Sequence, residues 1–592
     1  MKTLERFFLI LLLATAFPSQ AQIEITSKSS SQNYKGTPYN VSPIRLPVSM
    51  SGGFAEIRPN HFHSGLDLRT DGKEGERVYA PADGYVSRIN ISAWGGGKVL
   101  YITHPDGYRT VYMHLSAFCG EIGKFVHNYQ YSNHIFAFDI ELPKDSIKVI
   151  KGQLVALTGN TGGSAGPHLH YEIRYAENDQ TINPLFFGIP YSDPVAPTIA
   201  GIKLYPADPN SSINGKNKEL KLFPPTKNNN SKSNNDTATV AGRFYCGIYT
   251  YDQMEVGARN KNGVDRIELL VDGELIHRYT VPSFMFEETR AINAIIDFPQ
   301  YQQTREYYVV SRHLRGDRNN FSTSYNNDVA NSGYITFNDN KTHRLEYRVS
   351  DHKNNVTSKV FYVRNDTASL LPCGINALDN ITNSGEQIVY YKRFKLQKEG
   401  FSAEIQPYTV YENDLLTYSR TKSEANLTPV HRIGLKRHQL PPHQAFTVQM
   451  VIPGNIPDNL IDKLTIVCIN GKNASALSTK RNGNTLTAPS RSFGGFAIRL
   501  DTIAPTIKPV NFCDKKAFNG SLISVKIADN LTGVVSYSCL VNGEWQLAEH
   551  DGKTATLNIS AETLHKGSNR ITFRISDDVG NITEQSWTII KK

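Results

Sequence analysis

Three features are scarce in this sequence: long apolar runs, cysteines and clustered basic residues. Only one long apolar segment occurs in 592 residues and the mean hydropathy is −0.39, which excludes a polytopic membrane protein. The 43 glycines show no period of three, so a collagen-like protein is excluded too. Lys and Arg number 64 against 55 Asp and Glu, and no basic cluster is interleaved with aromatic residues, so we expect no nucleic-acid partner.

The six cysteines are widely spaced and form no Cys-x-x-Cys pair. A zinc site made of thiolates is therefore not expected. An oxidising compartment would allow one or two disulfides, and Cys513 with Cys539 is the first pair to consider. Buried free thiols are the favoured interpretation.

The single long apolar run lies at the N-terminus. Lys2 and Arg6 precede an apolar stretch from Phe7 to Phe17, and a short polar end follows up to Ala21. This order predicts a secretory signal over 1–21, cleaved after Ala21. The run is shorter than the roughly 20 residues that span a bilayer, so no transmembrane anchor is expected. We therefore expect export to the periplasm or cell envelope, or out of the cell.

At about 150 residues per domain, the length predicts about four domains. The 30 tyrosines and 27 phenylalanines, with few long Ala/Leu/Glu stretches, favour a mainly β protein. After a polar leader at 22–45, residues 46–190 read as short strands with Gly-rich turns and no long helical period. Asp106-Gly107 predicts a hairpin there.

Two pairs of segments further along the chain resemble each other. APTI occurs at 196–199 and again at 504–507, while HRLEYRVSD at 343–351 resembles NRITFRISD at 569–577. Repeated start and end signals predict two related Ig-like β-sandwich modules, 191–365 and 501–592. The first carries a polar stretch at 207–237 that reads as a mobile insertion. Residues 366–500 are expected to form a further β-rich domain.

Histidines and one aspartate form a candidate metal site within 46–190. His63 and Asp67 are four residues apart, and His168 and His170 are two apart, so both of these histidines point to one face of a strand. His114 lies on the next candidate strand. Two histidines and a carboxylate form a known catalytic zinc set with an open position. Iron oxygenase and jelly-roll metal patterns were alternatives, but both fit the spacings poorly.

Four blocks of this domain resemble the LytM/lysostaphin family of zinc peptidases, family M23. They are RPNHFHSGLD at 58–67, VYAPADGYV at 78–86, YMHLS at 112–116 and TGNTGGSAGPHLHYE at 158–172. They occur in the family's order and span about a quarter of the chain, roughly 50–190. The resemblance implies a LytM-like antiparallel β-sheet domain.

The same resemblance implies particular roles for five residues. His63, Asp67 and His170 would bind one Zn²⁺ per chain, and His114 and His168 would be catalytic. It also implies an exported endopeptidase that hydrolyses cross-linking peptides of bacterial peptidoglycan through a zinc-activated water. All five positions are filled, which argues against a metal-free member of the family.

One segment departs from the family pattern, because residues 119–146 form a longer link than usual. We expect this link to form part of the cleft rim. Two alternative functions stay open: a non-catalytic envelope regulator on the same scaffold, and an adhesion or wall-binding protein that works through its β-sandwich modules. The C-terminal modules could also contact other envelope proteins.

Overall fold

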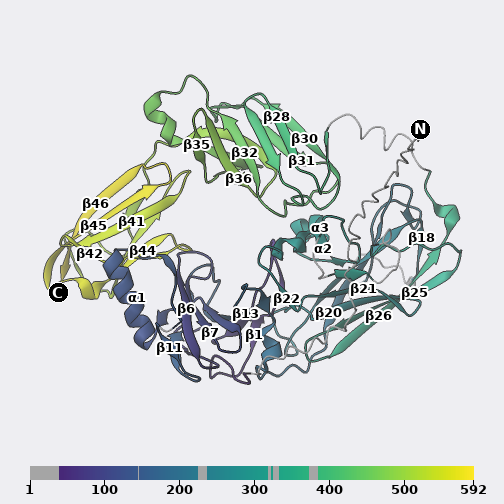
Figure 1. Cartoon of the computed structure of the whole chain (residues 1–592), viewed down its shortest axis with the longest axis horizontal. Helices are drawn as coiled ribbons and strands as arrows, with labels where there is room; N and C mark the ends of the chain where they lie inside the picture. Colours follow the sequence, from purple (N-terminus) through teal and green to yellow (C-terminus); the bar gives the residue numbers. More distant parts are fainter. Residues whose placement is uncertain (1–38, 145, 224–236, 318–321, 325–331, 373–384) are drawn as a thin grey trace, which may run out of the picture. The chain divides into compact units, whose positions relative to one another are not determined.

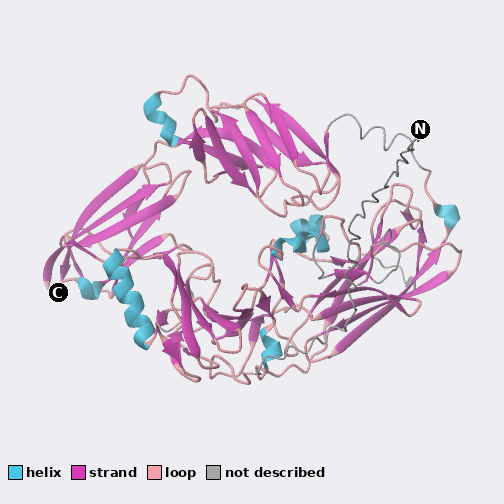
Figure 2. Cartoon of the chain, in the orientation of Figure 1, coloured by secondary structure: helices cyan, strands magenta, loops and turns pink. Residues whose placement is uncertain are grey.

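The computed structural model describes residues 39–144, 146–223, 237–317, 322–324, 332–372 and 385–592 (Figure 1). The predicted signal over 1–21 and residues 22–38 of the predicted leader lie outside these ranges. Strands dominate the described chain, as Figure 2 shows, and the mainly β fold class is confirmed. Within the described ranges, no helix combines the length and apolar character needed to cross a membrane.

The domain that carries the candidate site is built on one antiparallel sheet. The predicted hairpin at Asp106-Gly107 is confirmed, because β7 (Lys98–Thr103) pairs with β8 (Tyr108–Met113) and Gly107 has a φ of 88°. The main path of the sheet runs through β1 (Met50–Gly52), β4 (Leu66–Arg69), β13 (His168–Tyr175), β8 (Tyr108–Met113), β7 (Lys98–Thr103), β6 (Gly84–Ile91) and β10 (Phe138–Glu141). Joined to it are β11 (Lys148–Val149), β14 (Thr181–Ile182) and β22 (Ser283–Phe284).

Strand β13 explains how one element serves both the core and the site. Its side chains alternate between two faces, as in any strand. Leu169, Tyr171 and Ile173 are fully buried apolar residues on one face. His170 and Glu172 lie on the other face, which is buried as well. Because the polar side chains on this face are buried, their hydrogen-bond partners must come from within the protein.

A smaller sheet and a helix complete this domain. The sheet contains β5 (Arg77–Tyr79), β12 (Leu154–Leu157) and β9 (Ala117–Phe118), and a two-stranded ribbon forms from β2 (Ile57–Arg58) and β3 (His61–Phe62). The helix, α1, covers Gly120–Asn133, in a region where the sequence shows no long helical period. Only Ile122, Val126 and Gln130 are buried on it, four residues apart. Three buried positions, one of them the polar Gln130, give only a weak helical periodicity in the sequence.

Two sheets are formed largely from residues 191–365, which we call the first module. One contains β17 (Leu220–Phe223), β15 (Thr198–Pro206), β19 (Phe244–Tyr251) and β23 (Val309–Val310). The other contains β16 (Ser212–Ile213), β18 (Thr237–Ala241), β26 (Val356–Asn365), β25 (Thr342–Ser350), β20 (Arg266–Val271), β21 (Glu274–Thr280) and β24 (Ser322–Ser324). Short helices cover Ile292–Ile295 (α2) and Phe298–Thr304 (α3). Part of the predicted insertion forms β16 and β17, and its residues 224–236 lie outside the described ranges.

Residues 386–500 form two further sheets that share one apolar core. The first consists of β27 (Glu386–Ile388), β30 (Asp414–Thr421), β31 (Val430–Leu435), β37 (Gly494–Leu500), β33 (Leu464–Asn470) and β34 (Asn473–Ala476). The second consists of β28 (Phe394–Lys398), β29 (Phe401–Ile405), β32 (Phe446–Val451), β36 (Thr485–Ser490) and β35 (Lys480–Asn482).

Residues 501–592, the C-terminal module, again form two sheets around one core. The first consists of β38 (Thr506–Pro509), β40 (Leu522–Ala528), β44 (Thr556–Ser560) and β43 (Glu549–Asp551). The second consists of β39 (Lys516–Phe518), β46 (Ile582–Lys591), β45 (Gly567–Asp577), β41 (Val534–Val541) and β42 (Glu544–Trp545). In both modules the last strand pairs antiparallel with the strand before it and parallel with an early strand. The two modules therefore share a strand arrangement as well as sequence signals.

The described cysteines are all free thiols. Cys513 is exposed and Cys539 is buried, so this pair forms no disulfide in the structure. Cys373 lies outside the described residues.

Candidate metal and catalytic site

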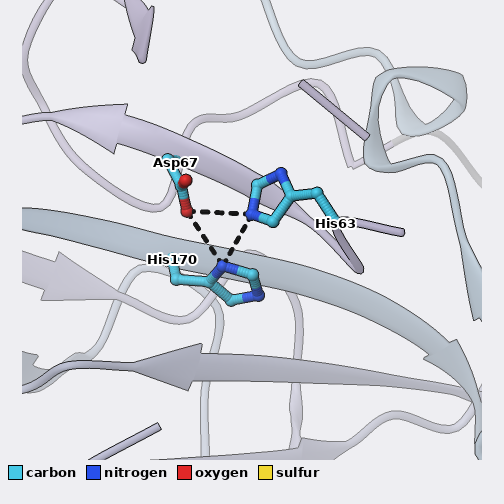
Figure 3. Close-up of side chains that lie close together, drawn as sticks. All are labelled: His63, Asp67 and His170. Atoms are coloured by element: carbon cyan, nitrogen blue, oxygen red, sulfur yellow. Dashed lines mark hydrogen bonds and ion pairs between the residues drawn. The ribbon is translucent and has the colours of Figure 1, made fainter. Parts of the chain in front are cut away.

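Three side chains converge on one point between β4 and β13 (Figure 3). Nε2 of His63 lies 3.0 Å from Oδ1 of Asp67 and 3.0 Å from Nδ1 of His170, and the His170 and Asp67 atoms are 2.9 Å apart. Asp67 and His170 are direct partners in the β4–β13 register, while His63 reaches in from the loop before β4. The structure thus brings together the three residues that the family resemblance implied as ligands.

The outer nitrogen of each histidine is held by the protein. Nδ1 of His63 lies 2.7 Å from the carbonyl oxygen of Gly53, so this nitrogen carries the proton and Nε2 keeps a lone pair. Nε2 of His170 lies 2.9 Å from Oε1 of Glu172, which leaves Nδ1 to face the centre. Partners of this kind fix the tautomer and orientation of metal-binding histidines.

Glu172 is itself fully buried and held from two sides. It accepts hydrogen bonds of 2.5 Å from the hydroxyl of Ser64 and 2.5 Å from Nε of Arg174. Burial would raise the pKa of Glu172, but Arg174 and then His170 outweigh it and lower the pKa to about 2. The residue is therefore a carboxylate, and it accepts a hydrogen bond from Nε2–H of His170.

The charges around the centre favour a cation. Burial lowers the pKa of His63 to about 4. Burial would also lower the pKa of His170, but hydrogen bonds with Asp67 and Glu172 raise it to about 9. The metal-free ring therefore carries a proton on Nδ1 as well, and a bound metal ion would displace that proton. Asp67 forms an ion pair with Arg58 at 2.5 Å. Burial would raise the pKa of Asp67, but His63, His168 and His170 outweigh burial and hold this pKa well below its usual range.

His114 and His168, the two residues implied as catalytic, lie beside this centre. Their ring centroids are 4.9 Å apart, and His114 lies 6.0 Å from the ring of His170. Nε2 of His168 is 3.3 Å from Oδ1 of Asp67. Nδ1 of His114 faces the carbonyl of Thr161 at 2.8 Å, and Nδ1 of His168 faces that of Gly166 at 2.8 Å. Each ring therefore presents Nε2 as its reactive nitrogen.

The position of the His114 ring depends on close contacts between backbone segments. His114 follows β8 with a φ of 62°, a left-handed conformation that non-glycine residues adopt mainly where the surroundings enforce it. Thr161, whose carbonyl holds the ring of His114, precedes Gly162, which has a φ of 69°. A Cβ on Gly162 would lie 2.3 Å from the backbone nitrogen of Gly97. The glycine is needed at this close approach.

A cleft of about 600 Å³ opens beside the histidines. Loops 69–72 and 163–167 line it, together with His114, His168 and Asn260 from the first module. None of the described residues of 119–146 (all but 145) lines it, so the expected rim role of this link was wrong. Its helix α1 packs on β9 and β12 instead.

Sequence reasoning missed Arg58, Glu172 and Asn260. Glu172 could have been found, because it lies two residues after His170 and so shares its face of β13. Arg58 lies inside a matched block but has no spacing that marks it as a partner of Asp67. Asn260 is more than 190 residues from Asp67 in the chain, and no local pattern links them.

The residues present fit a bound zinc ion. Two imidazole nitrogens and one carboxylate oxygen are a catalytic zinc donor set, and tetrahedral coordination at about 2.0–2.1 Å separates ligand atoms by roughly 3.3 Å. The three atoms here are slightly closer, at 2.9–3.0 Å. Their outer partners, Gly53 and Glu172, complete the arrangement. The His63, Asp67, His170 cluster could therefore hold a metal ion.

Comparison with known proteins identifies two segments. Residues 61–132 match the family described as Peptidase family M23, and residues 386–501 match the Zu5-like domain. An uncharacterized metalloprotease of Haemophilus influenzae is 34% identical over 174 residues, which are 29% of this chain and 27% of that protein. The DD-carboxypeptidase/endopeptidase Mpg of Neisseria meningitidis is 32% identical over 128 residues, 22% of this chain and 23% of that protein.

Two further proteins share the same region. The murein hydrolase activator NlpD of Salmonella dublin is 29% identical over 21% of this chain and 25% of its own length. The solved catalytic domain of the M23 protein EnpA from Enterococcus faecalis is 25% identical over 24% of this chain and 89% of that structure, with a TM-score of 0.17. The chain spans about a quarter of the length of the curated relatives it matches.

Proposed function

We propose that this chain, which carries a peptidase family M23 domain, is an exported zinc metalloendopeptidase that hydrolyses cross-linking peptides of bacterial peptidoglycan. One observation carries the proposal: three ligand atoms converge within 3.0 Å of one another, and two further histidines lie at the same cleft. A metallopeptidase needs both parts, a Lewis acid and groups that move protons. The relative Mpg, named as an endopeptidase, supports the same reaction class.

The ligand set would be His63, Asp67 and His170. Zinc bound there would supply Lewis-acid chemistry, polarising the scissile carbonyl and making a water molecule more acidic. Asp67 contributes the negative charge of the set, and Arg58 orients its second oxygen. Glu172 keeps His170 in the tautomer whose Nδ1 can bind.

His114 is a neutral ring that can accept a proton from the attacking water, although its low pKa makes it a weak base. Burial first, and then the charges of His170 and His168, lower its pKa to about 3, so the ring is neutral at physiological pH. Its Nδ1 proton is engaged by Thr161, which leaves Nε2 as the acceptor. His168 has its Nδ1–H engaged by the carbonyl of Gly166 and presents Nε2 to the cleft. Only its imidazolium form, with a second proton on Nε2, could donate a hydrogen bond to the developing oxyanion.

The other parts of the prediction belong to the same proposal. The apolar segment after Lys2 and Arg6 would direct export to the periplasm or cell envelope, or out of the cell. The modules after residue 190 would position the enzyme on the wall or contact other envelope proteins.

A regulatory role on the same scaffold is the second candidate, favoured by the likeness to a murein hydrolase activator. The presence of His114 and His168 beside a full ligand set favours catalysis, since a purely regulatory domain would not need them.

The test is digestion of purified, cross-linked wall fragments by the zinc-loaded full chain, with mass spectrometry of the products. We expect new peptide termini at the cross-links, no cleavage after chelation, and recovery on adding zinc. Intact fragments after incubation with zinc-loaded, folded protein would favour the regulatory role.

A further inference from the structure

The first module and the C-terminal module each bring three aspartates together at one end of the module, which we call the aspartate corner of that module. In the first module these are Asp193, Asp252 and Asp351, and in the C-terminal module Asp501, Asp529 and Asp577; in each set the carboxylate oxygens lie within 4.8 Å of one another. The sets occupy equivalent positions. One aspartate lies three residues before the repeated APTI segment, one directly follows β19 or β40, and one ends the repeated VSD or ISD segment.

A single asparagine braces each corner in the same way. In the first module, Nδ2 of Asn355 donates to the carbonyl of Asp193 at 2.9 Å and to Oδ2 of Asp351 at 2.8 Å. In the C-terminal module, Nδ2 of Asn581 donates to Asp501 at 3.0 Å and to Asp577 at 2.7 Å. The asparagine that links two of the three aspartates is thus common to both modules.

The carboxylates differ in what satisfies them. In the C-terminal module, the amide and hydroxyl of Thr532 donate to Oδ2 of Asp501 at 3.1 and 2.7 Å. Backbone amides of Leu531 and Gly533 donate to Oδ2 of Asp529. One carboxylate oxygen, Oδ1 of Asp529, is buried there without a partner, and Asp529 itself is half-buried.

In the first module, an asparagine replaces the threonine that donates in the other. Asn262 precedes Gly263 as Thr532 precedes Gly533, and its backbone pairs with Asp252 at 2.8 and 2.9 Å. Side chains directly opposite in such a pair lie on the same side. Asn262 is 5% exposed and its Oδ1 has no hydrogen-bond partner, nor has Oδ1 of Asp252, which is 4% exposed. Two buried oxygens therefore face the corner unsatisfied.

The corner has little compensating positive charge, because Lys353 acts electrostatically on Asp193 without forming an ion pair with it. Among the described residues, no lysine or arginine forms an ion pair with Asp193, Asp252 or Asp351. The nearby Lys353 lies with its Nζ 4.1 Å from the centroid of the Tyr191 ring. The three aspartates and Asn262 line one cavity of about 50 Å³, which has room for an ion and a water molecule.

We propose that Asp193, Asp252, Asp351 and Asn262 bind one Ca²⁺ ion in the first module. Three carboxylates and an amide oxygen form an all-oxygen set, which Ca²⁺ binds with irregular geometry, completing six to eight ligands with water or backbone carbonyls. The set has no nitrogen or sulfur ligand of the kind that favours zinc. The ion would tie Asp193, which lies just before β15, to the ends of β19 and β25.

This site would also lie close to the peptidase site without being part of it. Gly53 lines the same cavity, and its carbonyl holds Nδ1 of His63. Calcium binding should therefore stabilise the first module and the loop around Gly53 together.

The test is calorimetric titration of the zinc-loaded full chain with Ca²⁺ alone, with Mg²⁺ as a comparison, and thermal unfolding with and without Ca²⁺. We expect a saturable site with a dissociation constant of about 10⁻⁴–10⁻³ M or tighter, preference over Mg²⁺, and a raised Tm. Asp252→Asn should weaken calcium binding about tenfold or more, because it removes a charged ligand. Asn262→Thr introduces the residue type found at the equivalent position of the C-terminal module, Thr532, and should also weaken calcium binding. It provides a second test of the site if Asp252→Asn fails to fold.

Asp529→Asn in the C-terminal module is the matched control and should retain the site that Asp252→Asn removes. Absence of binding heat, or equal calcium affinity in wild type, Asp252→Asn and Asn262→Thr, would overturn the proposal. A shared proton is the competing account, because burial and the neighbouring aspartates raise the pKa of Asp252 to about 7. That account predicts a Tm that falls as pH rises from 4 to 7 and does not respond to Ca²⁺, and such a result would also overturn the proposal.

Discussion

Nε2 of His170 lies 2.9 Å from Oε1 of Glu172, so the strand that supplies a metal ligand also supplies the group that orients it. The two residues are neighbours on one face of β13. This relationship makes Glu172 part of the site although it lies outside the ligand set.

Glu172→Gln should lower zinc affinity by about 10- to 100-fold, because it removes the carboxylate that fixes the tautomer of His170. The measurement is competition with a chromophoric zinc chelator. Glu141→Gln, at an exposed position of the same sheet, should leave the affinity unchanged. An unchanged affinity in folded Glu172→Gln would show that Glu172 has only a structural role.

His63→Ala and Asp67→Ala should each lose most of the bound zinc, since each removes one of three protein ligands. Elemental analysis of purified protein gives the zinc content directly, and we expect about one zinc per chain in the wild type. Asp71→Ala, at the cleft edge, is the control and should keep zinc. Full occupancy in both ligand variants would refute the assignment.

Phe284→Ala should destabilise the peptidase domain although Phe284 belongs to the first module. The ring is fully buried, 5.5 Å from the ring of Phe54 and 5.6 Å from that of Phe62, which precedes His63. Loss of a buried phenylalanine costs about 3–5 kcal/mol. Urea unfolding and hydrogen exchange at β3 and β4 would measure the effect.

The control is Val256→Ala at a 92% exposed position, which should change stability by less than about 0.5 kcal/mol. If Phe284→Ala is as stable as this control, residues 46–190 form their core without help from the first module.

The first module should lose stability as pH falls below about 6.5. Burial lowers the pKa of His277 to about 3, so the ring stays neutral in the folded chain and becomes protonated in the unfolded chain. The unfolded state then binds more protons, and stability falls by about 1.4 kcal/mol per pH unit, or about 2 kcal/mol at pH 5. Chemical denaturation at pH 7 and pH 5 tests this. His277→Leu should show a smaller loss, and an equal loss in both proteins would contradict the assignment.

The sequence was sufficient to predict five residues that the structure brings close together. Period-two alternation placed His168 and His170 on one face, and the blocks around His63 and His114 completed the set. Local patterns could not show that Asp67 is opposite His170, because strand register is a tertiary property.

The failures have physical causes as well. Helix α1 buries too few residues to give a strong period, and its link lies away from the cleft because it packs on β12. The rim is instead completed by Asn260, which the fold brings from a distant segment. Of the six aspartates, only Asp351 and Asp577 end a repeated segment of the sequence, and the convergence of each set of three is visible only in the folded chain.

The central claim is that three of the converging residues hold zinc while two perform catalysis. The measurement that tests it most directly is zinc content and the rate of muropeptide cleavage on the same samples of His114→Ala, His168→Ala and His170→Ala. We expect the first two to keep zinc and lose about 10²- to 10⁴-fold in rate, and the third to lose zinc. Wild-type rates per bound zinc in His114→Ala and His168→Ala, or loss of zinc from His168→Ala with retention in His170→Ala, would contradict the account.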